Sequence, residues 1–360
     1  MIIEPKVSVI MSTYNHASFV GKTIESVLSQ ENVDFEFLII DDGSRDNTMD
    51  IVMSYTDPRI KVLPNKGNRG ACIAANDLIE RAHGKYIALI NSDDYWEGTD
   101  KLAIQTNFLD SHPHIGACFG KARFIDKDDN VIKSSDLPFG NVFEQSNRSK
   151  GEWLRFFFES GNCICHPTML IRRSCYNEVG NYNNSFRQLP DYDMWIRLVK
   201  KWDIHIFDNI FINFRIMPGE NASSQTSANS IRTINEHYLI ACDFFDGVSR
   251  SDFIAGFSDL FKGGQENIDE VSIEIEKVLL LFSENRWLNR AYSMAALPKL
   301  LKLLNSPDHA TYLSSYYDID AHWFHNKMSD VDVLLPKVVA ELQIKKGKFD
   351  RIFKFLRRLS

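Results

Sequence analysis

Two pairs of neighbouring aspartates follow apolar, strand-like runs in the N-terminal part of the chain. Asp41-Asp42 ends the segment FEFLII, and Asp93-Asp94 closely follows YIALI. Adjacent carboxylates repel each other, and a divalent cation placed between them and an anionic ligand relieves that repulsion. A hard cation such as Mg²⁺ is commonly held by one or two carboxylates together with substrate phosphates. The pairs therefore indicate a metal-bound phosphate site, although Ser92-Asp93-Asp94 alone is explained better as the cap of a following helix.

Strand-like and helix-like segments alternate around these pairs. The strand-like runs are nearly continuous in apolar character, which is typical of strands buried on both faces of a parallel sheet; they are residues 7–13, 35–40, 59–63 and 86–90. Apolar residues at helical spacing mark the segments between them, 18–30, 47–55 and 70–82. The alternation predicts an α/β, Rossmann-like fold with a mostly parallel central sheet and flanking helices. Ligands bind beyond the carboxyl ends of such strands, where both aspartate pairs lie.

The later part of the chain changes character. Strand candidates at 115–125 and 169–171 and a helix candidate at 191–201 are followed by a Ser-, Asn- and Gly-rich stretch at 217–230 that reads as a linker. Beyond it the pattern is almost purely helical, over residues 231–245, 271–282, 287–304 and 331–344. We therefore predict one α/β domain over residues 1–220 and an all-helical region over residues 221–360.

Composition excludes several classes of protein. The chain has 360 residues, with 41 Lys+Arg against 48 Asp+Glu, and its formal net charge of −7 argues against a general nucleic-acid binder. No apolar run has the length of a membrane span, and the N-terminus lacks the pattern of a signal peptide. We expect a cytoplasmic protein whose six cysteines are reduced. Cys163, Cys165 and His166 lack a second ligand pair at zinc-site spacing, which favours structural thiols.

The C-terminal segment IKKGKFDRIFKFLRRLS is basic and amphipathic. On a helix its apolar residues share one face and most of its Lys and Arg residues lie opposite, as in a helix that lies on a membrane surface. A packed C-terminal helix with a solvated basic face explains the same pattern. The first interpretation predicts peripheral contact with the inner face of the membrane, and the sequence leaves both open.

Four segments, taken together, resemble the successive motifs of family 2 glycosyltransferases with the GT-A fold, of the kind that build bacterial polysaccharides, O-antigens and capsules. No Gly-x-Gly dinucleotide fingerprint follows the first strand, and there is no P-loop. The resemblance covers about residues 6–220 in unbroken motif order and does not extend to the helical remainder. The segments are VSVIMSTYNHASFVGKTIESVLSQ, FLIIDDGSRDNT, NRGACIAANDLIERAHGKYIALINSDDYW and HPTMLIRRSCYNEVGNYNNSFRQLPDYDMWIRL.

On the donor side, the resemblance implies a role for each of five residues. Ser12 and Tyr14 would line the pocket of the nucleotide base, and Asp42 would hydrogen-bond that base. Asp93 would face the ribose, while Asp41 would orient its own loop. The implied partner is a nucleotide-sugar donor, most simply a UDP-sugar.

Three further residues match positions nearer the chemistry. Asp94 would ligate Mn²⁺ or Mg²⁺, and Arg215 would contact the diphosphate, with an ordinary salt bridge as its equal alternative. Asp191, in LPDYDMW, matches the base that takes the proton of an acceptor hydroxyl as this hydroxyl attacks the anomeric carbon, which gives inversion. Taken alone, Asp191 would be explained by the preference of carboxylates for helix N-termini. The metal would offset the charge on the departing diphosphate, so that no separate acid is required.

Three departures from the family pattern affect these expectations. Pro190 stands where the family usually has Glu, Ala75 stands where a basic residue is frequent, and Met217 stands where a His can serve the metal. They leave open which group besides Asp94 would complete the metal site. They also motivate an alternative function, a non-catalytic protein that binds nucleotide sugars or saccharides, and nucleotidyl transfer is a third option on a related sheet.

The leading hypothesis is a metal-dependent, inverting glycosyltransferase that adds single sugars to a saccharide or lipid-linked saccharide acceptor. The chain has no Gln-x-x-Arg-Trp segment of the kind found in processive synthases, which favours single transfers. The helical region over residues 221–360 is expected to serve the acceptor, a homo-oligomer or the membrane. The donor sugar, the acceptor and the linkage are set by loops without a motif, and the sequence does not identify them.

Overall fold

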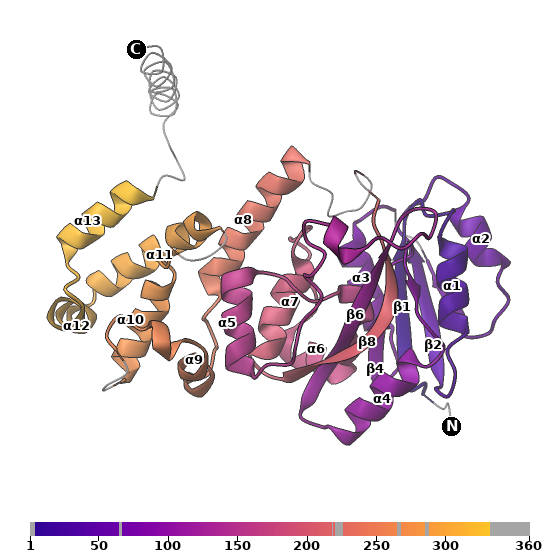
Figure 1. Cartoon of the computed structure of the whole chain (residues 1–360), viewed down its shortest axis with the longest axis horizontal. Coiled ribbons are helices and arrows are strands. Elements are labelled where there is room, and N and C mark those ends of the chain that lie inside the picture. Colours follow the sequence, from indigo (N-terminus) through magenta and orange to yellow (C-terminus); the bar gives the residue numbers. More distant parts are fainter. Residues whose placement is uncertain are drawn as a thin grey trace, which may run out of the picture. The chain divides into compact units, whose positions relative to one another are not determined.

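The chain folds into two compact units. The computed structural model describes residues 4–64, 67–217, 219, 226–264, 268–284 and 288–331. The first unit spans Met1–Asp259 and the second Leu260–Ser360 (Figure 1). This division comes later than the boundary predicted at residue 220, because two further helices pack onto the first unit.

An eight-stranded sheet forms the centre of the first unit, in the order β3-β2-β1-β4-β7-β6-β8-β5 (Figure 1). Strands β1 to β4 pair in parallel, and so do β6 and β8. Strand β7 runs antiparallel to both β4 and β6, and β5 runs antiparallel to β8. The strands are β1 (Val7–Thr13), β2 (Phe35–Asp41), β3 (Ile60–Leu63), β4 (Tyr86–Leu89), β5 (Tyr95–Trp96), β6 (Ile115–Ile125), β7 (Leu170–Arg172) and β8 (Asp203–Arg215). The predicted α/β fold with a mostly parallel sheet is confirmed.

Alternate residues of the strands pack against different layers of helices. One buried cluster combines Val9 and Met11 of β1 with Phe37 of β2 and with Ile24 and Val27 of α1. Helices on this side also include α2 and α4, whereas α3 contacts β1 and β2 without joining that cluster. Because both faces of these strands are covered, their sequences are almost continuously apolar. The helices are α1 (Val20–Leu28), α2 (Thr48–Ser54), α3 (Ala71–Glu80) and α4 (Lys101–Ser111).

The remaining helices of the first unit lie beyond β7 and β8, where two of them contact these strands. They are α5 (Lys150–Ser160), α6 (Arg173–Val179), α7 (Pro190–Val199), α8 (Ser227–Asp243) and α9 (Arg250–Phe257), with short 3-10 turns at Ser134–Asp136, His166–Thr168 and Ser258–Leu260. Phe158 of α5 lies at the centre of an aromatic cluster with Phe244, Phe245 and Phe257. This cluster joins α9 and the end of α8 to α5, which is why the first unit continues well past residue 220.

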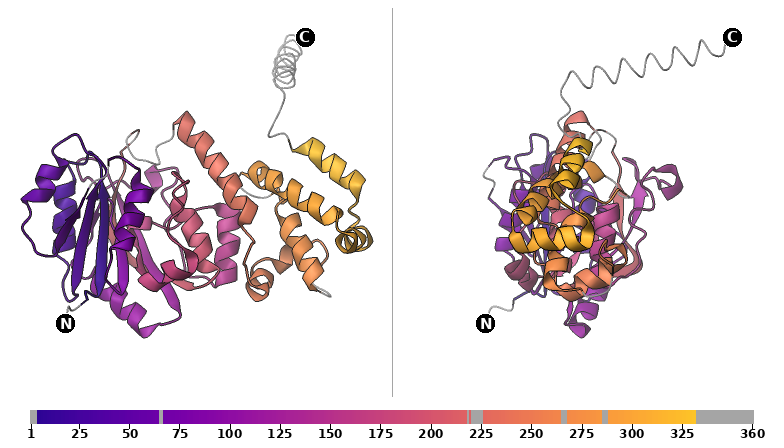
Figure 2. Two further views of the ribbon diagram at one scale, coloured as in Figure 1. Left: turned by 180° about the vertical axis from the view of Figure 1, so that it is seen from behind. Right: turned by 90° about the vertical axis from the view of Figure 1, so that its left-hand side faces the viewer.

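The second unit is helical in its described part, as predicted (Figure 2). It contains α10 (Glu270–Leu280), α11 (Asn289–Leu304), α12 (Pro307–Tyr317) and α13 (Ala321–Asp330). The helix predicted at 331–344 and the basic C-terminal segment lie almost entirely outside the described residues. Among the residues that are described, no helix has the length and the apolar character needed to cross a membrane.

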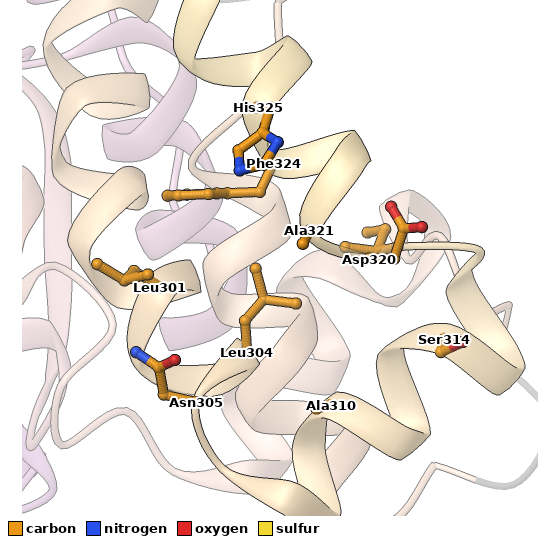
Figure 3. A pocket seen from close by; sticks show the side chains of 10 residues that line it. Leu301, Leu304, Asn305, Ala310, Ser314, Asp320, Ala321, Phe324 and His325 are labelled. Atoms are coloured by element: carbon orange, nitrogen blue, oxygen red, sulfur yellow. The ribbon is translucent and has the colours of Figure 1, made fainter.

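A cavity of about 360 Å³ opens in the second unit between α11, α12 and α13 (Figure 3). Leu301, Leu304 and Phe324 supply much of its apolar lining, and Asp320 and His325 are its ionisable residues. The cavity therefore contains no carboxylate pair of the kind that the sequence singles out in the first unit.

Candidate active site

The loops that follow β1 and β2 are tied together by hydrogen bonds. The main-chain N–H of Asp42 donates to the carbonyl oxygen of Thr13 at 2.8 Å. In the β1 loop, the Asn15 side-chain oxygen accepts from the N–H of Arg45 at 2.8 Å, and the Asn15 N–H donates to the Ser44 hydroxyl at 2.8 Å. Beside these anchored residues Tyr14 is 41 % exposed, so its ring is available to a ligand at the carboxyl edge of the sheet.

The two aspartates of the first pair bind different segments. The Asp41 carboxylate accepts from the N–H of Ser44 at 3.0 Å and from its hydroxyl at 2.5 Å, so it orients its own turn. The Asp42 carboxylate accepts from the N–H groups of Arg69 and Gly70, at 2.8 and 2.9 Å, just before α3. A carboxylate has about four acceptor positions, so these two bonds leave Asp42 able to accept from a nucleotide base as well.

Gly43 allows the sharp turn between these two loops. Its φ of +89° lies in the left-handed region, and a Cβ there would come within 3.2 Å of the Asn68 backbone nitrogen. A residue with a Cβ at this position would be strained and would press on the loop at Asn68, whose next two N–H groups bind the Asp42 carboxylate.

The second aspartate pair lies between β4 and β5 and is anchored from three directions. One carboxylate oxygen of Asp94 accepts from the Arg215 main-chain N–H at 2.7 Å, and the other accepts from the Asn91 side chain at 3.0 Å. The Thr23 hydroxyl of α1 donates to the Asp94 carbonyl oxygen at 2.6 Å. The next helix, α4, begins only at Lys101. The alternative interpretation of this pair as a helix cap is therefore wrong.

Burial makes this pair electrostatically unfavourable without a cation. Asp94 is 2 % exposed, and burial together with the neighbouring charge of Asp93 raises its pKa well above the usual carboxyl range. Burial also raises the pKa of Asp93, against the opposing charges of His16 and Arg215. The Asp93 carboxylate accepts a hydrogen bond from its own main-chain N–H, which favours its charged form. A divalent cation fits this donor set because it would neutralise the repulsion and use the free acceptor oxygens.

Protein ligands for such a cation are few. Within the part of the chain that the structure describes, no cluster of three or more His, Cys, Asp or Glu residues could hold a metal ion. Asp93 and Asp94 therefore resemble the sparse carboxylate sites in which substrate phosphates complete the coordination of Mg²⁺. Residues Cys163, Cys165 and His166 form no such cluster either, and the His166 ring bonds the Tyr182 hydroxyl at 2.7 Å.

Arg215, at the end of β8, is buried against the loop of the second pair. Its Nε donates to the Asp93 carbonyl oxygen at 2.8 Å, and its Nη1 donates to the Asp126 carbonyl oxygen at 2.7 Å. Its Nη2 pairs with the Asp129 carboxylate at 2.6 Å, and the guanidinium stacks on Phe19 at 4.5 Å. The structure thus shows the salt bridge that was the alternative interpretation of Arg215, and the guanidinium holds the Asp93 loop in place.

Replacing Arg215 by Gln should lower the free energy of unfolding by about 2–4 kcal/mol, because buried acceptors would lose charge-assisted donors. Lys22 provides the matched control, since its ammonium contacts the other oxygen of Asp129 at 2.7 Å but is 44 % exposed. Lys22→Gln should cost only about 0–1 kcal/mol, as surface ion pairs do. Urea midpoints of the two variants measure the difference, and equal shifts would contradict the anchoring role of Arg215.

Asp191 lies in the first turn of α7, directly after Pro190. Its carboxylate accepts from the side-chain amide of Asn162 at 2.7 Å, and Asn162 directly follows Gly161, which ends α5 with a φ of +82°. The buried thiol of Cys165 senses both Asp191 and Asp94, because burial and the charges of these two carboxylates raise its pKa. Direct contacts also link the two regions: the Trp96 indole, two residues after Asp94, donates to the Pro167 carbonyl oxygen at 3.2 Å, and the neighbouring His166 ring lies 5.5 Å from Trp195 of α7.

Burial favours the neutral form of the His166 ring. Burial lowers the pKa of His166, and the charge of Asp191 opposes that shift only in part. The neutral imidazole and the Tyr182 hydroxyl share a hydrogen bond, so His166 is satisfied structurally. The Asp191 carboxylate, by contrast, keeps acceptor positions beyond the one that the Asn162 amide occupies.

Three polar residues at this site were not predicted. Asn162 contacts the Asp191 carboxylate, as described above. Asn76 of α3 holds the chain at Tyr182, accepting from its N–H at 3.0 Å and donating to its carbonyl oxygen at 2.8 Å. Glu236 of α8 accepts from three backbone N–H groups just before α7. None of the three has a local sequence signal, because each acts on a segment far away along the chain.

Comparison with known proteins identifies the family of the chain. The model of the family described as glycosyl transferase family 2 matches residues 8–180. Escherichia coli WfaP, a UDP-Glc:alpha-D-GlcNAc-diphosphoundecaprenol beta-1,3-glucosyltransferase, is 30% identical over 254 residues, which cover 68% of this chain and 93% of WfaP.

Two solved structures share the fold. S. aureus TarS 1-349 in complex with UDP-GlcNAc aligns with a TM-score of 0.57 and 18% identity, covering 91% of this chain and 88% of that one. The mannosyltransferase PcManGT from Pyrobaculum calidifontis, in complex with GDP-Man and Mn²⁺, aligns with a TM-score of 0.53 and 16% identity, covering 93% and 89%. The sheet with its flanking helices is therefore a GT-A fold. The chain belongs to glycosyltransferase family 2 and is a nucleotide-sugar glycosyltransferase.

Proposed function

We propose that this glycosyltransferase inverts the anomeric configuration, depends on Mn²⁺ or Mg²⁺, and moves one sugar at a time from a UDP-sugar to a saccharide or lipid-linked saccharide. The observation that carries the proposal is the contact between the Asp93–Asp94 loop and the region of Asp191: the Trp96 indole, two residues after Asp94, donates to the Pro167 carbonyl oxygen at 3.2 Å, and the neighbouring His166 ring lies 5.5 Å from Trp195 of α7, the helix that carries Asp191. A single carboxylate facing a donor site is what direct displacement requires, because a double displacement needs a nucleophile as well.

The acceptor reacts in one step in this scheme. Asp191 takes the proton of the acceptor hydroxyl while the hydroxyl oxygen forms a bond to the anomeric carbon. The bond from that carbon to the diphosphate oxygen breaks with its electron pair, and nucleoside diphosphate leaves from the opposite face. A bound Mn²⁺ or Mg²⁺ would stabilise the charge on the diphosphate, and Asp94, with Asp93 beside it, is the residue that would hold it.

The donor nucleotide would occupy the carboxyl edge of β1 and β2. Tyr14 supplies an exposed ring and Asp42 a carboxylate at this edge, with Ser12 beside them and Asp93 toward the ribose. UDP is the preferred nucleotide because WfaP is named for UDP-Glc and TarS was solved with UDP-GlcNAc. PcManGT was solved with GDP-Man and Mn²⁺, so it supports the dependence on a metal ion but not the choice of uracil as the nucleotide base. A lipid-linked acceptor follows the GlcNAc-diphosphoundecaprenol named for WfaP.

The experiment that tests the proposal combines donor screening with product analysis. A panel of UDP- and GDP-sugars is first ranked by thermal shift with and without Mn²⁺. The product of the best donor is then analysed by NMR for its anomeric configuration and by mass spectrometry for the released nucleotide. We expect inversion, nucleoside diphosphate and loss of turnover with EDTA. Retention of configuration, or release of pyrophosphate, would contradict the proposal.

Replacing Tyr14 by Ala should weaken UDP binding roughly 5- to 100-fold, which is the range of about 1–3 kcal/mol that stacking of a base on an aromatic ring contributes. Tyr14→Phe keeps the ring and should bind nearly as the wild type does. Tyr316, which is 70 % exposed in the second unit, offers a matched control, since Tyr316→Ala should leave the Kd unchanged. Calorimetric titration with UDP and Mn²⁺ measures all three. An unchanged Kd in Tyr14→Ala would remove Tyr14 from the base pocket.

A further inference from the structure

A buried carboxylate on α8 captures the chain just before α7. Glu236 is 4 % exposed, and its two oxygens accept from three consecutive main-chain N–H groups. These donors are Arg187 at 2.9 Å, Gln188 at 2.9 Å and Leu189 at 2.8 Å. Hydrogen bonds from N–H groups to an ionised carboxylate are shorter and stronger than those to a neutral acceptor.

Helix α7 has no cap from its own side chains. Its N-cap residue is Leu189, whose side chain cannot accept a hydrogen bond, and Pro190 occupies the first turn. Glu236, on a helix distant in sequence, instead fixes the three residues that precede the first turn of α7, where Asp191 lies. A negative charge at this end also suits the helix dipole.

A second contact ties α8 to the same turn. The His237 ring lies 5.3 Å from the ring of Tyr192, which is adjacent to Asp191. The Tyr192 hydroxyl in turn donates to the Phe157 carbonyl oxygen of α5 at 2.6 Å. The first turn of α7 is therefore held from α8 on one side and from α5 on the other.

We propose that Glu236 is a positioning residue for sugar transfer: it fixes the segment 187–189 so that the Asp191 carboxylate meets the acceptor hydroxyl. The inference rests on the proposed role of Asp191 as the base. It also assigns α8 to the catalytic unit, although the sequence places this helix beyond the α/β domain. Misplacement of a reacting group by about 1 Å can lower the rate by about 100-fold.

The test compares Glu236→Gln with an equivalent change in the second unit. Glu276 is also buried, at 2 % exposed, and accepts from the main-chain N–H groups of Lys262 and Gly263 at 3.1 and 2.7 Å. Glu236→Gln should lower kcat by about 10- to 100-fold while the KM for the donor stays within about twofold. Glu276→Gln loses the same kind of contact and should leave both kinetic constants within about twofold.

Two more variants separate positioning from general destabilisation. Glu236→Asp keeps the charge, so it should recover part of the lost kcat, and it replaces Glu236→Gln should that variant not fold. In an Asp191→Asn background, Glu236→Gln should cause almost no further loss, because it acts through Asp191. The single Asp191→Asn variant shows separately whether the proposed base itself is correct.

Two results would overturn the inference. The first is a Glu236→Gln variant that is less stable but keeps the wild-type kcat while Asp191→Asn is inactive. If Glu236→Gln does not fold, a Glu236→Asp variant with the same behaviour counts in its place. The second is a full additional loss from Glu236→Gln in the Asp191→Asn background. Turnover that persists in Asp191→Asn would instead refute the proposed function on which the inference rests.

Discussion

Asp191→Asn should lower kcat for sugar transfer by about 10²- to 10⁴-fold, the contribution of a positioned general base. An amide cannot accept the proton of the acceptor hydroxyl, so the bond to the anomeric carbon forms without assistance. The replacement has almost the same shape, and its side-chain oxygen can still accept from Asn162, which donates to Asp191 at 2.7 Å. The variant should therefore fold normally and bind UDP with Mn²⁺ nearly as the wild type does.

Asp193, two residues further on, is the matched control. Its carboxylate pairs with Arg197 at 2.8 Å across one turn of α7. Asp193→Asn weakens this pair and should cost no more than about 1 kcal/mol of stability, with kcat within about twofold of the wild type. Single-turnover measurements with saturating donor compare the two variants directly. Undiminished turnover in Asp191→Asn, or an equal loss in Asp193→Asn, would exclude Asp191 as the base.

The strands that present the donor site were predictable because they are buried on both faces. The prediction for residues 7–13 coincides with β1, and the runs at 35–40 and 86–90 end within one residue of β2 and β4. Continuous apolar runs of this kind have few alternatives in an α/β protein. Once these strands are parallel, their carboxyl ends meet at one edge, and the positions of Asp42 and Asp93 follow.

Strand β8 was not predicted from the sequence, and its residue pattern explains why. It spans Asp203–Arg215, and residues 208–210 near its middle are exposed. Polar residues such as Asp208 and Asn209 interrupt the apolar run there, so it has neither the continuous pattern of a buried strand nor a clean alternation. The strand forms because it pairs along almost its whole length with β6, a contact that the sequence pattern does not reveal.

The contacts that support Asp191 could not be predicted from local patterns either. Asn162 is 29 residues away from Asp191 along the chain, and Glu236 is 47 residues away from Leu189. Neither residue type is unusual in its own segment, and a buried carboxylate has meaning only once its donors are known. The sequence thus predicts candidate carboxylates, whereas the residues that hold them in place are visible only in the fold.

Asp94→Asn should change the stability of the metal-free protein and its response to metal in opposite directions. Burial and the charge of Asp93 raise the pKa of Asp94 in the folded state. A carboxyl group whose pKa is raised by folding contributes its full stabilisation of the folded state below the unfolded pKa. This stabilisation is lost as the pH rises through the folded pKa. At neutral pH, which lies well above the unfolded pKa of a carboxyl group, Asp94 therefore destabilises the metal-free fold. Asn removes the ionisable group, and we expect a gain of roughly 0.5–2 kcal/mol, typical of relieving a strained functional site.

The same replacement should abolish the stabilisation by metal. Wild-type protein with UDP should gain about 2.7 kcal/mol at a Mn²⁺ concentration 100 times the Kd, and the Asp94→Asn variant should gain almost nothing and lose nearly all turnover. Protons compete with the cation for the ionised pair, so the wild-type gain should shrink as the pH falls, whereas the variant stays flat. Thermal unfolding with and without Mn²⁺, repeated over a pH series, measures each quantity.

Asp93→Asn is the control that distinguishes the two members of the pair. Burial raises the pKa of Asp93 too, so this variant should also be more stable without metal. If Asp94 is the ligand and Asp93 faces the ribose, Asp93→Asn should keep most of the Mn²⁺-dependent stabilisation while binding UDP more weakly. If Asp94→Asn keeps the full stabilisation by Mn²⁺ and Asp93→Asn loses it, then Asp93 is the metal ligand and Asp94 is not. That exchange of roles would move the cation to Asp93, and Asp94 would then serve to anchor the main-chain N–H of Arg215.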